Sequence, residues 1–335
     1  MYYKILFYLT LMIGTLISIS SYSWMGMWIG LEINLLSMIP LISKINNMMA
    51  SEAALKYFVT QALASSILLL SIIMMSMNNM YNMNSMLYFT LIFNSALLTK
   101  MGAAPFHFWF PEVMEGLTWM NSLIMLTWQK LAPMVLLMYS TNFYTYLILI
   151  IITSMLISGI MGLNQMSLRK ILAYSSINHI GWMISSMLFM ETIWLYYYMI
   201  YVIITINIIL IFKMLNIFYL NQLYISMNNN FMLKFFFIMN FLSLGGLPPF
   251  LGFMPKWLTI QLLIESNMYM LATLIIMMTL MTLYFYMRIT FSTILLSKTY
   301  TYYYNHAPMN NHLIMFINFI SIMGLILSTF LFNFM

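Results

Sequence analysis

The sequence predicts an all-α polytopic membrane protein with about eleven transmembrane helices. Hydrophobic residues make up 64% of the 335 residues and charged residues 5%, and the mean hydropathy is +0.94. Soluble proteins carry about 25% charged residues, so this chain has lipid rather than water as most of its solvent. Its long uncharged runs exclude a membrane barrel, because barrel strands alternate apolar and polar residues.

The composition also excludes several classes of function. The chain has no cysteine and no aspartate, so disulfides, thiolate metal sites and cysteine nucleophiles are excluded. Its four histidines make a poor metal cage, and we therefore predict no metal site. The net charge of +6 comes from basic residues that occur mostly singly, which argues against a nucleic-acid partner.

Apolar segments of about 20 residues, the length that crosses a bilayer core of about 30 Å, define the expected helices. They run near 3–21, 24–42, 54–76, 86–110, 117–139, 143–163, 170–190, 193–213, 234–265, 268–290 and 312–333. We interpret residues 1–335 as a single integral membrane domain. It contains approximate repeats at 1–140 and 143–290 and an extra C-terminal helix at 312–333.

The positions of the basic residues support this count of spans. Lys4 precedes the first span, and the loops that follow even-numbered spans contain or are flanked by Lys44, Arg169, Lys170, Lys213, Lys234 and Lys298. The loops that follow odd-numbered spans contain no lysine or arginine. Under the positive-inside rule, the N-terminus lies on the basic face of the membrane and the C-terminus on the opposite face.

Four charged residues lie well inside predicted spans and are not explained by topology, namely Glu32, Lys100, Lys130 and Lys256. A charge at the bilayer centre costs about 2.5–3.5 kcal/mol, so four of them favour a function over a passive spacer. Burial disfavours the charged form of a lysine and a nearby carboxylate favours it. A lysine between these influences can bind and release a proton. The alternative is that the charges only hold helices together.

Two histidines are further candidates for proton transfer. His107 follows Lys100 by seven residues and would share its face in an unbroken helix, although Pro105 predicts a break that weakens this inference. His179 lies in the middle of the seventh segment. A single histidine within a membrane can be either a proton carrier or a hydrogen-bonded core residue, and both interpretations stay open.

The fourth and ninth segments share a helix-breaking pattern, G-x-x-P-F-x-x-x-x-P, at an offset of 144 residues. Its glycines and prolines are Gly102, Pro105 and Pro111 in the first copy and Gly246, Pro248, Pro249 and Pro255 in the second. Proline removes a backbone donor, so a break within lipid requires protein or water to satisfy the freed carbonyl groups.

An offset of five spans, an odd number, means that the second copy runs in the opposite direction. Interrupted helices at matching positions of inverted repeats indicate an ion path. The charges do not match at this offset, because Leu244 aligns with Lys100 and Lys256 with Glu112. Chance similarity between two stretches rich in glycine and proline is the alternative.

Four segments resemble the chain 2 family of NADH–ubiquinone oxidoreductase, the antiporter-like membrane subunits of respiratory complex I. They are Lys100–Glu112, Leu126–Pro133, Ala173–Gly181 and Leu244–Trp257, and Trp28–Asn34 fits as well. The resemblance spans almost the whole chain. It implies antiporter-like inverted five-helix repeats with two broken helices. The abundance of Met, Ile and Asn resembles an insect or other invertebrate source.

The resemblance also implies roles for the candidate residues. Glu32 would pair with Lys100 on the first broken helix, Lys130 would be the connecting central lysine, and Lys256 would lead towards the exit side. His107 and His179 match intervening positions. The implied location is the mitochondrial inner membrane, with the N-terminus in the matrix and the C-terminus in the intermembrane space.

The expected function is proton conduction within complex I, the H⁺-translocating NADH:ubiquinone reductase. The chain contains no flavin, iron–sulfur or quinone-site motif, so NAD, FMN, iron–sulfur clusters and ubiquinone are expected in partner subunits. The expected partners are other membrane-arm subunits, accessory subunits and inner-membrane phospholipids. The alternatives are a stand-alone cation/proton antiporter and a purely structural membrane subunit.

Overall fold

The computed structural model describes residues 2–43, 47–78, 83–141, 143–227, 231–295 and 318–319. Within these ranges the chain forms fourteen named helices and no strand, which confirms the predicted all-α class. The predictions on Lys44, on Lys298 and on a helix at 312–333 lie outside the described residues.

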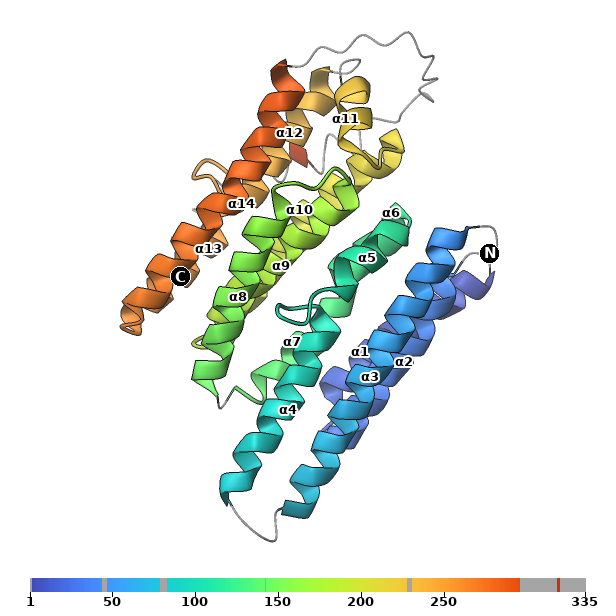
Figure 1. The fold of residues 1–335 in the computed structure, drawn as a ribbon, viewed down its shortest axis with the longest axis vertical. Helices are drawn as coiled ribbons and strands as arrows, with labels where there is room; N and C mark the ends of the chain where they lie inside the picture. Colours follow the sequence, from blue (N-terminus) through green and yellow to red (C-terminus); the bar gives the residue numbers. More distant parts are fainter. Residues whose placement is uncertain are drawn as a thin grey trace. The chain divides into compact units, whose positions relative to one another are not determined.

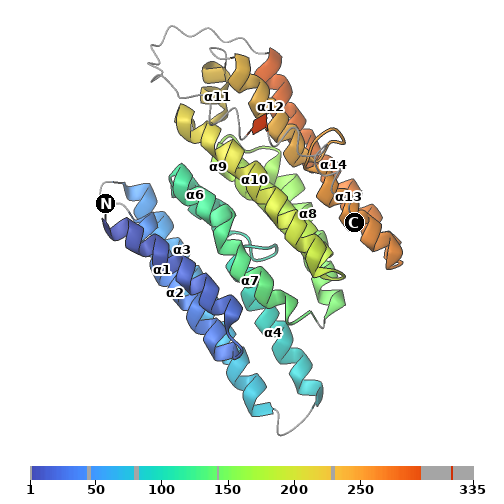
Figure 2. The same ribbon diagram turned by 180° about the vertical axis from the view of Figure 1, so that it is seen from behind.

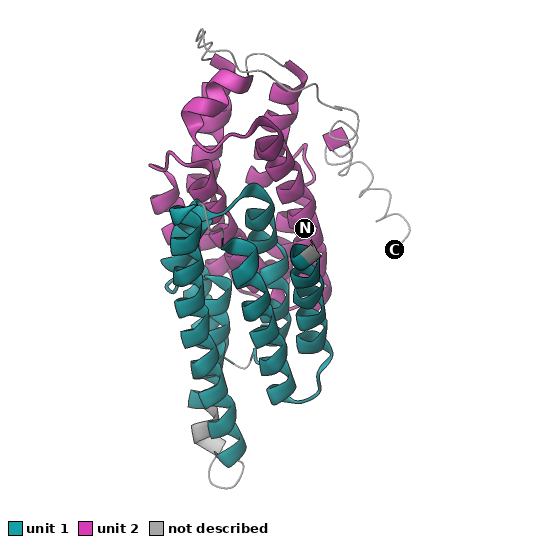
Figure 3. Cartoon of the chain, turned by 90° about the vertical axis from the view of Figure 1, so that its right-hand side faces the viewer, with its two compact units in different colours: residues 1–154 teal, residues 155–335 magenta. Residues whose placement is uncertain are grey.

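Contacts divide the chain into two compact units, residues 1–154 and 155–335, which Figure 3 shows in different colours. The first unit contains α1 (Tyr2–Ser20), α2 (Trp24–Ile42), α3 (Met48–Asn78), α4 (Met83–Met101), α5 (Trp109–Gly116), α6 (Trp119–Leu126), α7 (Trp128–Met138) and the start of α8 (Tyr144–Gly162). The helices α1, α2 and α3 lie side by side in both Figure 1 and Figure 2.

The second unit begins within α8. It continues with α9 (Leu168–Met187), α10 (Glu191–Leu215), α11 (Leu220–Met227), α12 (Phe231–Gly245), α13 (Phe253–Glu265) and α14 (Tyr269–Leu295). The boundary between the units falls inside a helix, and the repeats expected at 1–140 and 143–290 stay a prediction. The short helix α11 was not predicted from the sequence.

Six helices of the described part are long and apolar enough to cross a membrane, namely α1, α2, α3, α8, α10 and α14. The predicted segments 86–110 and 234–265 are each interrupted, as their prolines indicated. Segment 117–139 is interrupted as well, which the sequence analysis did not predict. At Thr127, between α6 and α7, the side-chain hydroxyl donates to the carbonyl of Leu123 at 2.7 Å, a bond that bends helices.

Hydroxyl side chains within these apolar helices are satisfied locally. Ser18 donates to the carbonyl of Thr15 at 2.8 Å, and Ser154 donates to that of Ile151 at 2.8 Å. This bond to the preceding turn lets serine and threonine lie in a membrane helix without an unsatisfied polar group. Such residues therefore do not by themselves mark a functional site.

The helices α1 and α2 approach each other closely at small residues. A Cβ atom added to Gly30 would lie 2.5 Å from the backbone nitrogen of Ser18 and 2.7 Å from the carbonyl oxygen of Gly14. Small residues at helix contacts allow backbones to approach in membranes, where packing rather than the hydrophobic effect drives association.

We expect Gly30→Ala to destabilise the contact between α1 and α2 by about 1–3 kcal/mol, because neither backbone atom can move aside easily. The temperature at which the chain aggregates in detergent extracts should fall. Gly245→Ala on α12 is the control, since its Cβ would meet the side chain of Tyr286 at 3.5 Å, an ordinary contact distance. Equal aggregation temperatures for both variants would contradict this account of the contact.

Candidate functional site

Both copies of the glycine–proline pattern interrupt a helix. The first break separates α4 from α5, and the second separates α12 from α13. Gly102 and Gly246 follow the ends of α4 and α12 with φ of +73° and +78°. This left-handed conformation suits glycine because a Cβ atom would clash with the following carbonyl.

The two breaks also share their backbone hydrogen bonds. The amide of Ala103 donates to the carbonyl of Leu98 at 3.1 Å, and the amide of Leu247 donates to that of Leu242 at 3.3 Å. Both bonds end their helix in the same way and lie 144 residues apart. The pattern seen in the sequence is therefore a repeated backbone structure.

The prolines of the pattern lie where a helix tolerates them. Pro105, Pro248 and Pro249 lie within the breaks, where no helical hydrogen bond is required of them. Pro111 and Pro255 each occupy the third position of α5 and α13. Amides of the first turn have no helical partner in any case, so proline does not weaken these helices.

Side chains from three other elements satisfy the carbonyl groups that the first break leaves open. The bonds run from Trp109 Nε1 to Thr99 O at 3.0 Å, from Gln61 Nε2 to Lys100 O at 3.4 Å, and from Thr153 Oγ1 to Ala104 O at 3.2 Å. The donors belong to α5, α3 and α8. Protein groups thus meet the requirement that apolar surroundings impose on an interrupted helix.

Lys100 lies in the last turn of α4, with 7% of its surface exposed. The negative end of the helix dipole stabilises a cation at this position. Glu32, half-buried on α2, interacts electrostatically with Lys100, but no ion pair within 4.0 Å joins the two side chains. The structure therefore brings the two residues into one site without direct contact, and their pairing stays a prediction.

A small cavity of about 10 Å³ adjoins Lys100, with room for about one water molecule. Asn34, Gln61 and Gln129 also line it. Asn34 Oδ1 and Gln129 Nε2 are buried and have no hydrogen-bond partner among the described residues. Two unsatisfied polar atoms around a cavity of this size indicate a hydration site beside the lysine.

The sequence analysis did not single out Asn34 or Gln129. Each lies close to a charged residue in the sequence: Asn34 lies two positions after Glu32, and Gln129 directly precedes Lys130. An amide next to an intramembrane charge was the available signal. Their meeting at one cavity depends on the packing of α2 against α7, which the sequence pattern does not reveal.

Lys130 is 1% exposed and lies in the first turn of α7. Its Nζ atom is 5.4 Å from the centroid of the Phe110 ring on α5, a cation–π distance. The sequence analysis placed Lys130 in the middle of a continuous span. The structure places it at the start of a helix, where the positive end of the dipole repels a cation. Lys100 thus lies at the C-terminal end of a helix, whereas Lys130 lies at the N-terminal end of another.

His107 lies inside the first break rather than on a helix, and it is 2% exposed. Its Nδ1 atom is 3.3 Å from the carbonyl oxygen of Pro105, and its ring contacts that of Phe108. The break that Pro105 predicts is confirmed, because residues 102–108 are not helical, and His107 therefore does not share a helical face with Lys100. The relay role of His107 stays a prediction.

Lys56 forms ion pairs that the sequence analysis missed. Its Nζ atom is 2.8 Å from a carboxylate oxygen of Glu52 and 2.8 Å from one of Glu112, on α5. All three side chains are substantially exposed. Exposed ion pairs contribute little stability, so this cluster connects α3 to the second half of the broken helix without forming part of the buried site.

Lys256, on α13, reaches back across the second break. Its Nζ atom donates to the carbonyl of Gly245, the last residue of α12, at 2.8 Å, and lies 5.8 Å from the centroid of the Trp182 ring. A Cβ atom on Gly246 would lie 2.8 Å from this nitrogen. The glycine therefore provides the space that the ammonium group occupies.

The two lysines occupy matching places although their sequence positions do not match. Lys100 lies in the last turn of α4, and Lys256 Nζ contacts the last residue of α12. Both lysines are therefore associated with the C-terminal end of the helix that precedes a break, Lys100 as one of its residues and Lys256 through its ammonium group. The sequence offset aligned Lys256 with Glu112 and so missed this correspondence.

His179, 5% exposed on α9, lies beside the second break. Its Nδ1 atom is 2.9 Å from the hydroxyl of Tyr197, and its ring lies 5.1 Å from that of Tyr201. A cavity of about 10 Å³ joins His179 and Tyr197 to Ser243 and Gly252, and it too has room for about one water molecule. The structure thus places His179 at the break, and its relay role stays a prediction.

Comparisons with known proteins agree with this architecture. The family described as NADH:quinone oxidoreductase/Mrp antiporter, TM, matches residues 21–282. The chain is 48% identical to NADH-ubiquinone oxidoreductase chain 2 of Anopheles gambiae over 330 residues, which cover 96% of each chain. It is 49% identical to the protein of that name from Aedes aegypti over 335 residues, which cover 98% of this chain and 97% of the relative.

The fold resembles a chain of respiratory complex I from Thermus thermophilus with bound aureothin. The TM-score is 0.87 at 23% sequence identity, and the match covers 98% of this chain and 79% of that one. At this identity the likeness concerns the fold alone.

Proposed function

The chain belongs to the NADH-ubiquinone oxidoreductase chain 2 family, and from this premise we propose how it conducts protons as a membrane subunit of respiratory complex I. The observation that carries the proposal is the pair of buried lysines at the ends of two interrupted helices. Lys100 and Lys256 are 7% and 6% exposed. Charges buried in this way are costly in a membrane and are typical of proton pathways.

The proton enters at Glu32 and Lys100 in this proposal. The carboxylate on α2 stabilises the ammonium group electrostatically, and a change in their separation alters how firmly the lysine holds its proton. One water molecule in the cavity between Asn34, Gln129 and Lys100 carries the proton towards α7. The two unsatisfied amide atoms would orient this water.

Lys130 receives the proton next, and Lys256 passes it towards the exit side. At rest the carbonyl of Gly245 holds the Lys256 ammonium. Release requires this bond to open, which makes the end of α12 the gate of the exit path. His107 and His179 are intermediate carriers in this proposal, and His179 would act through the cavity that it shares with Ser243.

This role also requires a particular number of spans, a location and an orientation of the chain ends. We propose about eleven spans in two inverted five-helix repeats, a mitochondrial inner-membrane location, the N-terminus in the matrix and the C-terminus in the intermembrane space. The redox groups NAD, FMN, iron–sulfur clusters and ubiquinone would belong to partner subunits. The partners would include other membrane-arm subunits, accessory subunits and phospholipids.

We expect Lys100→Met to reduce proton translocation by assembled complex I about 100-fold, because the first buried proton acceptor is lost. The measurement is acidification of proteoliposomes driven by NADH oxidation. Lys213→Met, an exposed lysine at the end of α10, is the matched control and should translocate protons normally. Full translocation by Lys100→Met would rule out the entry step.

Two further experiments separate the alternative functions. If the chain alone in liposomes exchanges cations for protons, it is a stand-alone antiporter. If Glu32→Gln combined with Lys100→Met lowers assembly but the remaining complex translocates protons fully, the charges only hold helices together.

A further inference from the structure

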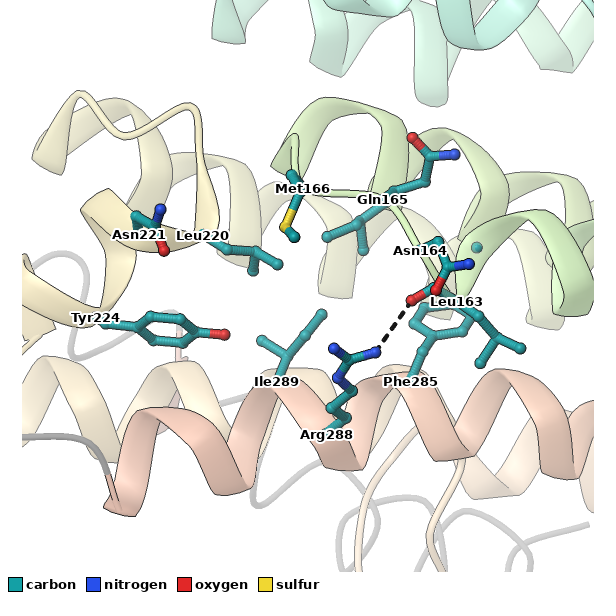
Figure 4. Close-up of a pocket in the computed structure, with 12 residues that line it drawn as sticks. Leu163, Asn164, Gln165, Met166, Leu220, Asn221, Tyr224, Phe285, Arg288 and Ile289 are labelled. Atoms are coloured by element: carbon teal, nitrogen blue, oxygen red, sulfur yellow. Dashed lines mark hydrogen bonds between the residues drawn. The ribbon is translucent and has the colours of Figure 1, made fainter.

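A polar cavity of the second unit shares no lining residue with the break between α12 and α13. Its volume is about 370 Å³, and its walls come from the loop after α8, from α11 and from α14. Polar groups of Asn164, Asn221, Tyr224 and Arg288 line it. Figure 4 shows Arg288 rising from α14 next to Ile289, with Tyr224 pointing into the same space.

Arg288 is the charged group of this cavity and has spare hydrogen-bonding capacity. Its Nη1 atom donates one long bond, 3.4 Å, to the carbonyl of Leu163, drawn as a dashed line in Figure 4. A guanidinium group has five N–H donors in a planar fork. Among the described residues no carboxylate lies within 4.0 Å of it. The cavity is therefore suited to an anion that accepts several hydrogen bonds, such as a phosphate group.

A second, apolar groove shares Arg288 with the polar cavity. Tyr284, Met287, Phe291 and Leu295 line this groove along α14, and its volume is about 480 Å³. Tyr284, Phe291 and Leu295 are 61%, 51% and 77% exposed. Arg288 thus lies between the polar cavity and the apolar groove. A phospholipid likewise has a polar headgroup next to apolar acyl chains.

The position of Arg288 along α14 fits the membrane interface. A helix of 27 residues is about 40 Å long, which is close to the thickness of a bilayer with its headgroups. Arg288 lies seven residues before the end of α14, or about 10 Å from it. Lys234 Nζ donates to the carbonyl of Ile294 near the same end at 3.4 Å, so a second cation lies close to this surface.

We propose that the cavity binds the phosphate headgroup of an anionic phospholipid, with Arg288 as the principal ligand and one acyl chain in the groove along α14. Tyr224 and Asn221 provide further hydrogen bonds to the headgroup. The apolar groove excludes free phosphate as the natural occupant, because a free anion leaves that surface unfilled. The proposal concerns lipid binding and does not depend on the proton path.

The test uses intact complex I in detergent and a phosphatidylglycerol that carries a photoactivatable diazirine at the end of one acyl chain. After illumination, digestion should place the label on the part of α14 that precedes Arg288, because an acyl chain runs from the headgroup towards the bilayer centre. Arg288→Gln should reduce this labelling about tenfold, because a charge-assisted hydrogen bond is lost. Lys213→Gln, an exposed cation at the end of α10, should leave it unchanged.

A second variant keeps the test informative if Arg288→Gln does not assemble. Asn221 is exposed, so Asn221→Leu should assemble and should reduce the labelling about threefold through loss of a neutral hydrogen bond. Unlabelled phosphatidylglycerol should compete with the probe, whereas excess inorganic phosphate should not. Equal competition by inorganic phosphate, no label on α14, or full labelling of both variants would overturn the proposal.

Discussion

Lys130→Met is expected to abolish proton translocation through this subunit while leaving the complex assembled. Methionine resembles lysine in length and is readily accommodated at a site that is 1% exposed, so packing around Phe110 is retained. The relay group is lost, and translocation should fall about 100-fold or more. Proteoliposome acidification measures translocation, and native electrophoresis measures assembly.

Lys130→Arg distinguishes a proton relay from a structural charge. Arginine keeps the positive charge and the contact with an aromatic ring, but its guanidinium group does not release a proton in proteins. We expect the arginine variant to translocate as poorly as the methionine variant. If arginine restored translocation, the charge alone would be required and the relay role would be wrong.

The second large effect is expected from Gly246→Ala. The added Cβ atom would lie 2.7 Å from Cδ and 2.8 Å from Nζ of Lys256, so the ammonium group would leave the carbonyl of Gly245. The left-handed backbone at φ +78° would cost a further 1–2 kcal/mol, roughly, for a residue with a side chain. We expect proton translocation to fall about tenfold through loss of the charge-assisted hydrogen bond.

Gly245→Ala provides a matched control at the adjacent position. Its Cβ atom would meet the nearest side chain, that of Tyr286, at 3.5 Å, which is an ordinary contact. Because Gly245 lies in a helix, alanine should even favour the local structure. Normal translocation by Gly246→Ala, or an equal loss in both variants, would show that the space beside Lys256 is not required.

The helix breaks and the buried charges could be predicted from the sequence. Gly102 and Gly246 mark both breaks through local rules, because glycine adopts a left-handed conformation and proline cannot continue a helix. The interruption at Thr127 could not be predicted in this way. A threonine hydroxyl that bonds the preceding turn occurs in many continuous helices, so its residue type alone carries no signal.

The partners of the buried charges could not be predicted from the sequence pattern. Asn34 and Gln129 meet at one cavity beside Lys100 only because α2 and α7 pack there. The match between Lys100 and Lys256 was also hidden, because Lys256 belongs to the helix after the break and reaches back to the helix before it.

By itself the sequence determined that this protein is a helical membrane protein, which spans contain charges and where two helices break. Hydropathy, charge and backbone preference are properties of short segments, so they can be determined from the sequence without a structure. Only the tertiary structure decided which groups meet: the ammonium of Lys256 at the end of α12, the unsatisfied amides beside Lys100, and Arg288 between a polar cavity and an apolar groove. These contacts join residues of different helices, and their geometry follows from how side chains pack rather than from any local pattern.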